Sequence, residues 1–63
     1  MKRNRRVVVN ECPMMAGHRG RVLATNYQGS GLVLVELDDP IHIGWPEGED
    51  RYFTFYRHEL QVL

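Results

Sequence analysis

The side chains that could act as nucleophiles or metal ligands are few in this chain. Cys12, His18, His42 and His58 are its only thiol and imidazole groups. A structural zinc site takes about four ligands, usually in closely spaced pairs such as two cysteines separated by two residues. No such pair occurs here, so the sequence predicts no metal site and no cofactor.

A catalytic pair of Cys12 with His18 or His58 would need a third group to orient it and a site sheltered from water. A chain of 63 residues has little interior in which to build such a site. Free cysteine is more commonly a small buried apolar residue. We therefore expect a binding module rather than an enzyme, with no catalytic residues. A single cysteine forms no internal disulfide, which favours the reducing cytoplasm.

Charge is distributed unevenly along the chain, although the eight basic and eight acidic residues balance. Half of the basic residues lie within the first six positions, as Lys2, Arg3, Arg5 and Arg6. From residue 7 onward, four arginines face all eight acids, which gives a formal charge of −4. We expect residues 1–5 to be a flexible basic arm and residues 6–63 to be one domain.

Short β-branched and aromatic segments, separated by proline, glycine and asparagine, must build that domain. They predict strands at residues 6–10, 20–26, 32–37, 51–56 and 60–63, with a helical turn at 56–59 before the last strand. No segment has helical periodicity, and none is a signal-peptide core or an apolar run long enough to cross a membrane. The fold class is therefore all-β, and we expect no membrane association.

Successive side chains of a strand point to opposite faces of the sheet. In two of the expected strands, this alternation predicts which side chains fill the interior. Val33, Val35 and Leu37 share one strand face, while Glu36 lies on the opposite, wetter face. Phe53 and Phe55 likewise share a face. We predict that Val33, Val35 and Leu37 belong to the core.

The glycine-centred segment at residues 17–22, Gly-His-Arg-Gly-Arg-Val, followed by Val-Leu-Val-Glu-Leu at 33–37, resembles a KOW motif. This short hairpin occurs in certain ribosomal proteins and transcription elongation factors. The resemblance covers about a third of the chain. It implies that Gly20 is the central glycine, at a point where a side chain would block the bend into the strand.

A second resemblance covers more of the chain. The order of strand, glycine hairpin, apolar strand and long loop, closed by Phe55, Glu59, Leu60 and Leu63, is similar to the small SH3-like barrel protein of photosystem I. It implies a five-stranded SH3-like barrel in which Phe55 and Leu60 point inward on either side of the helical turn. The aromatic-rich loop that follows the first strand of that photosystem protein is absent, so the resemblance implies the fold and not the photosynthetic role.

The segment 38–50 and an exposed aromatic face are the predicted site for a protein partner. The only tryptophan lies in this segment, and tryptophan is enriched at the centres of protein interfaces. The predicted partner-binding residues are Ile41, Ile43, Trp45, Tyr52 and Tyr56. Two other interpretations stay open: the apolar residues of 38–50 fold back as a lid on the core, or they extend the neighbouring strands into a longer hairpin.

An alternative is nucleic-acid binding of the KOW type through the basic arm. Its predicted contact residues are Lys2, Arg3, Arg5, Arg6, Arg19 and Arg21. Affinity for nucleic acid comes largely from lysine and arginine at phosphates, and the acidic remainder of the chain opposes it. Protein binding by a monomer is the favoured hypothesis.

Overall fold

The structure, a computed structural model, describes residues 2–12, 15–42 and 49–63. Its strands are β1 (Arg6–Val9), β2 (Arg19–Ala24), β3 (Val33–His42), β4 (Glu49–Phe55) and β5 (Leu60–Val62). Two 3-10 turns accompany them, η1 (Tyr27–Gly29) and η2 (Arg57–Glu59). The all-β prediction is confirmed.

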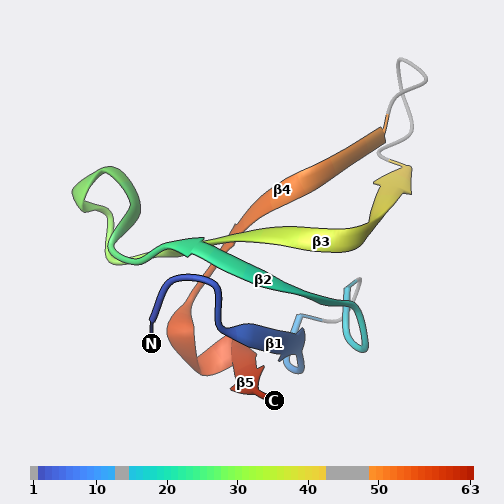
Figure 1. Ribbon diagram of the computed structural model, residues 1–63, viewed down its shortest axis with the longest axis horizontal. Helices are drawn as coiled ribbons and strands as arrows, with labels where there is room; N and C mark the ends of the chain where they lie inside the picture. Colours follow the sequence, from blue (N-terminus) through green and yellow to red (C-terminus); the bar gives the residue numbers. More distant parts are fainter. Residues whose placement is uncertain (1, 13–14, 43–48) are drawn as a thin grey trace.

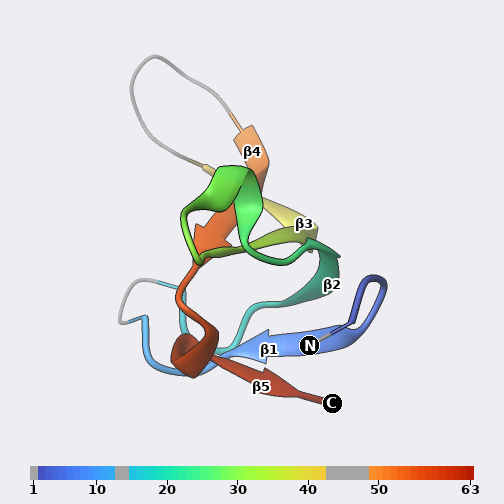
Figure 2. The same cartoon turned by 90° about the vertical axis from the view of Figure 1, so that its left-hand side faces the viewer.

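All five strands form a single antiparallel sheet in the order β4-β3-β2-β1-β5. The sheet is strongly twisted, and β1 and β5 lie apart from β3 and β4 (Figures 1 and 2). Neither β4 nor β5 has a second neighbour among the described strands, so these two strands are the edges of the sheet.

One face of the sheet carries the core. Within the described part of the chain, the buried side chains are Val7, Val9, Val22, Val33, Val35, Leu37, Phe55 and Leu60. All three predicted core residues of β3 are among them. Phe55 and Leu60 are both buried on either side of η2, as the second resemblance implies. Met15 and Cys12 pack against this cluster from the segment after β1.

Gly20 lies within β2, and its constraint is a close approach rather than an unusual backbone angle. A Cβ atom at this position would lie 2.5 Å from the carbonyl oxygen of Glu36 and 2.8 Å from Cγ1 of Val35. Real side chains do not tolerate such contacts. Glycine is therefore favoured here because the paired strand β3 approaches β2 too closely at this point for a side chain.

The strand boundaries differ from the prediction mainly after residue 37. The prediction ended the third strand there, but β3 runs to His42 and β4 begins at Glu49. The register of the β3–β4 pair shifts between Glu36 and Ile41, and beyond the shift Ile41 pairs with Asp50. Pro40 lies inside this irregularity, beyond Leu37, the last β3 residue whose register with β2 is given. A proline, which has no N–H to donate, is accommodated more easily there than in a regular ladder.

Candidate functional site

Residues with outward-pointing side chains alternate with core residues on β1 to β4 and form the outer face of the sheet. The cross-strand register places one residue from each of these strands in a single row: Arg6, Arg21, Glu36 and Tyr52. Cross-strand neighbours on one face lie close enough for their side chains to interact. We call these four residues the outer row.

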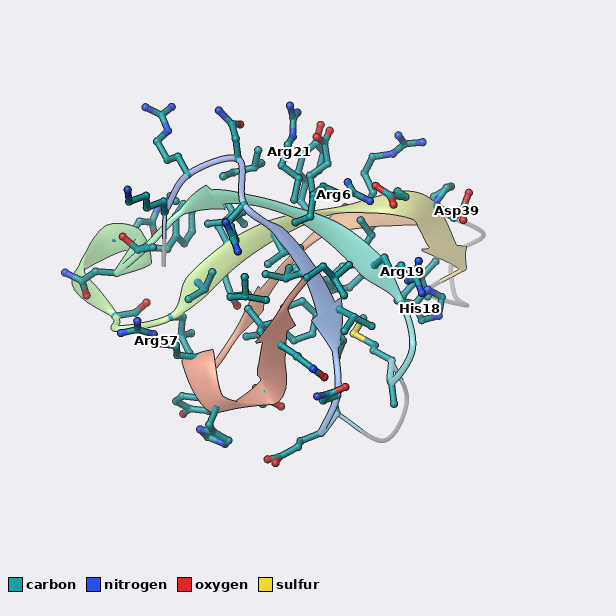
Figure 3. All side chains as sticks on the ribbon, turned by 60° about the horizontal axis from the view of Figure 1, so that its bottom comes forward. Arg6, His18, Arg19, Arg21, Asp39 and Arg57 are labelled. Carbon is teal, nitrogen blue, oxygen red and sulfur yellow. The ribbon has the colours of Figure 1, made fainter. Side chains whose placement is uncertain are left out.

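Carboxylates neutralise both arginines of the outer row. Nη1 of Arg6 donates to Oδ1 of Asp38 at 2.8 Å, and Nη2 donates to Oδ2, so the pair is bidentate. Nη2 of Arg21 donates to Oε1 of Glu36 at 2.7 Å. Figure 3 shows Arg6 and Arg21 projecting from the same side of the sheet.

Hydrogen bonding in these pairs shifts the acid–base equilibria of the groups. The hydrogen bond from Arg21, supplemented by one from Tyr52, lowers the pKa of Glu36 below its ordinary value. The hydrogen bond from Arg6 lowers the pKa of Asp38, and the charge of Arg19 adds a smaller effect in the same direction. Both carboxylates therefore stay ionised and paired at neutral pH.

Tyr52 ends the outer row and borders a shallow depression. The depression has a volume of about 410 Å³ and is lined by Glu36, Pro40, Asp50, Arg51 and Tyr52. Tyr52 is 52% exposed, and its backbone N–H donates to Oδ1 of Asp50 at 3.0 Å. An exposed aromatic ring beside a proline and charged groups offers both apolar area and hydrogen bonds to a partner.

The other residues predicted to bind a protein partner have different surroundings. Tyr56 is 59% exposed but lies beyond the end of β4, where its ring stacks on that of His58. Ile41 lies in β3 and pairs with Asp50 of β4, as the longer-hairpin interpretation expects for this residue. It is also half-buried against the core, as the lid interpretation expects. Ile43 and Trp45 lie outside the described residues, so their predicted role stays a prediction.

The basic residues of the alternative site fall into two groups. Lys2, Arg3 and Arg5 are exposed, and the backbone near them is hydrogen bonded to β2: the N–H of Asn4 donates to the carbonyl of Val22 at 2.6 Å. Arg6, Arg19 and Arg21 are exposed on the strands, and two of them are in the ion pairs of the outer face. The division of the chain at residue 5 stays a prediction.

Another depression was missed by sequence reasoning. It has a volume of about 250 Å³ and is lined by Thr25, Asn26, Gly31, Val33 and Arg57. We call it the η2 pocket, because Arg57 opens that turn. Arg57 lies more than thirty positions after Thr25 and Asn26 in the sequence, so no local pattern signals their proximity.

No group of three or more histidine, cysteine or acidic side chains among the described residues could hold a metal ion. Within the same residues, no helix is long and apolar enough to span a membrane. Comparison of the chain with protein families, curated proteins and solved structures finds no match.

Proposed function

We propose that the chain is a small, non-enzymatic protein-binding module whose partner contacts Tyr52 and the depression beside it. The observation that carries this proposal is the exposed Tyr52 ring next to Glu36, Pro40, Asp50 and Arg51. Tyrosines in such positions are frequent anchors of protein interfaces. In this proposal, the segment 38–50 extends the contact and brings Ile43 and Trp45 to the partner.

The charges of the outer face support a protein partner over nucleic acid. Because Asp38 and Glu36 already pair with Arg6 and Arg21, a phosphate would have to compete with these carboxylates for the two arginines. Phosphate neutralisation supplies most of the non-specific affinity for nucleic acid. A surface of mixed and compensated charge instead favours hydrogen bonding to another protein.

An SH3-like barrel is the proposed fold family. The strand order β4-β3-β2-β1-β5, with a 3-10 turn between β4 and β5, supports it. A crystal structure with β4 and β5 curled toward each other around the core would agree with this proposal. An open, flat sheet would contradict it.

The test uses peptides selected from a random displayed library on the immobilised protein. A selected peptide should bind Tyr52→Ala about thirtyfold more weakly than the unchanged protein, as expected for an interface anchor. Tyr56→Ala is the matched control, because it removes a tyrosine of similar exposure that does not line the depression. Equal affinity of all three proteins for every selected peptide would overturn the proposal.

The nucleic-acid alternative is tested separately by fluorescence anisotropy with a labelled single-stranded RNA of mixed sequence. Binding that falls steeply between about 50 and 200 mM salt would favour this alternative. Loss of that binding in a variant with Lys2, Arg3 and Arg5 replaced by glutamine would assign it to the arm. The protein-binding proposal predicts no such salt-dependent binding.

A further inference from the structure

We propose that the η2 pocket binds a single oxyanion group, a carboxylate or a phosphate, held by Arg57. The pocket lies at the end of the sheet where the β2–β3 connection meets the start of η2. Figure 3 shows Arg57 beside that connection and away from Arg6 and Arg21. None of its lining residues belongs to the depression beside Tyr52, so this site is independent of the proposed protein-binding function.

Arg57 differs from the arginines of the outer row in having no counter-ion within the part of the chain that the structure describes. The ion pairs among those residues are the ones made by Arg6 and Arg21. No acidic residue lines the η2 pocket. The acid nearest along the chain, Glu59, uses Oε1 to accept the N–H of Tyr56 at 2.8 Å. The guanidinium of Arg57 is therefore available to an external anion.

The remaining polar groups of the pocket complement an acceptor. Oδ1 of Asn26 accepts the N–H of Gly31 at 2.7 Å, which leaves its amide NH₂ group to donate. Thr25 also lines the pocket, and its side chain carries a hydroxyl that can donate. A guanidinium, an amide NH₂ and a hydroxyl together suit a ligand that only accepts hydrogen bonds, as ionised carboxylates and phosphates do.

The backbone of the β2–β3 connection is shaped to hold Asn26 in this position. Asn26 and Gln28 have φ angles of 48° and 51°, in the left-handed region that non-glycine residues seldom adopt. The Ser30 hydroxyl donates to the carbonyl of Tyr27 at 2.6 Å and accepts the N–H of Leu32 at 3.1 Å. These internal hydrogen bonds fix the connection before any ligand arrives, which lowers the entropy cost of binding.

Size limits what the pocket can hold. Its volume of about 250 Å³ is below that of typical small-molecule sites, about 300–1,000 Å³. It therefore accommodates one anionic group with a few attached atoms, either as a free small anion or as the end of a larger molecule.

The test is an amide chemical-shift titration of the ¹⁵N-labelled protein with inorganic phosphate and, separately, with acetate. Ionic strength is held constant with sodium chloride. The expected result is saturating shifts at Thr25, Asn26, Gly31 and Arg57 with at least one of the two anions. Saturation by acetate alone identifies a carboxylate site, by phosphate alone a phosphate site, and by both a general oxyanion site.

Two variants and a control make the assignment specific. Arg57→Gln should weaken binding about tenfold or more, because it removes charge-assisted hydrogen bonds. Thr25→Val should weaken it less. Arg3→Gln removes the same charge from the exposed arm and should leave binding unchanged. Shifts that never saturate, that persist in a folded Arg57→Gln protein, or that map to residues 2–5 would overturn the proposal.

Discussion

The outer face of the sheet and the η2 pocket both present arginines, but they use them differently. On the outer face, Asp38 and Glu36 neutralise Arg6 and Arg21 within hydrogen-bond distance. In the η2 pocket, Arg57 stands among neutral donors. Arginine therefore forms ion pairs within the protein on the outer face, whereas in the proposed η2 pocket site it is available to a ligand. Arg57 is therefore the proposed anion ligand because it combines a place in a pocket with the lack of a counter-ion among the described residues.

Truncating a core side chain beneath the outer row should have the largest effect on the free energy of unfolding. Leu37 is 1% exposed and lies between Glu36 and Asp38, the two acids that neutralise the row. Leu37→Ala is expected to cost about 2–5 kcal/mol, a large fraction of the stability of a small domain. Leu63→Ala removes the same side chain from a half-exposed position and should cost less than about 0.5 kcal/mol. Urea unfolding followed by circular dichroism measures both, and equal costs would contradict the placement of the core.

Two glycines, one in the strand pairing beneath the outer face and one in the η2 pocket, distinguish the cost of crowding from the cost of backbone strain. Gly20→Ala should cost about 1–3 kcal/mol, because the added Cβ meets the backbone of β3. Gly31→Ala should cost about 1 kcal/mol, because φ is +80° although no atom lies within 4 Å of the new Cβ. The same unfolding measurement compares them. A larger loss at Gly31 than at Gly20 would mean that β2 and β3 do not approach as closely as described.

Acidification should weaken the outer face. The pKa values of Glu36 and Asp38 lie below their ordinary values of 4.5 and 3.8 in the folded protein. Their contribution to stability is therefore complete above those ordinary values and is lost as the pH falls through the lower folded-state values. The urea concentration at the unfolding midpoint should therefore decrease as the pH is lowered through these folded-state pKa values.

Two variants test whether the Arg6–Asp38 pair supplies part of this acid-sensitive stability. Asp38→Asn should make the fall of the urea midpoint shallower, because one of the two shifted carboxylates is gone. Asp39→Asn, which removes a neighbouring exposed carboxylate with no ion pair among the described residues, should leave it unchanged. An identical acid profile for Asp38→Asn and the unchanged protein would show that the Arg6–Asp38 pair does not stabilise the fold.

Local patterns predicted much of the fold. Alternation identified Val33, Val35 and Leu37 as core residues because strand periodicity is set by backbone geometry. The turn before the last strand was also predicted, and Phe55 and Leu60 flank it as expected. The extension of β3 beyond residue 37 was missed, because Asp38 and Pro40 have loop-forming propensities that pairing with β4 overrides.

The site depended on contacts that local patterns do not contain. The Arg6–Asp38 pair joins residues 32 positions apart. Arg57 and Thr25 line the same pocket because the strands bring distant parts of the chain together. The sequence therefore identified Tyr52 as exposed but did not reveal which arginines are neutralised. The register of the sheet determines which arginines lie beside a carboxylate. In the β3–β4 pair, this register includes an irregularity between Glu36 and Ile41.

The most direct test of the protein-binding proposal is a chemical-shift titration of the ¹⁵N-labelled protein with a peptide selected on it. The account predicts that the largest shifts occur at Glu36, Arg51 and Tyr52, the residues around the depression on the outer face. Thr25 and Gly31, in the η2 pocket, should serve as internal references that move little. Largest shifts at residues 2–5 or around Arg57, with Tyr52 unmoved, would contradict it.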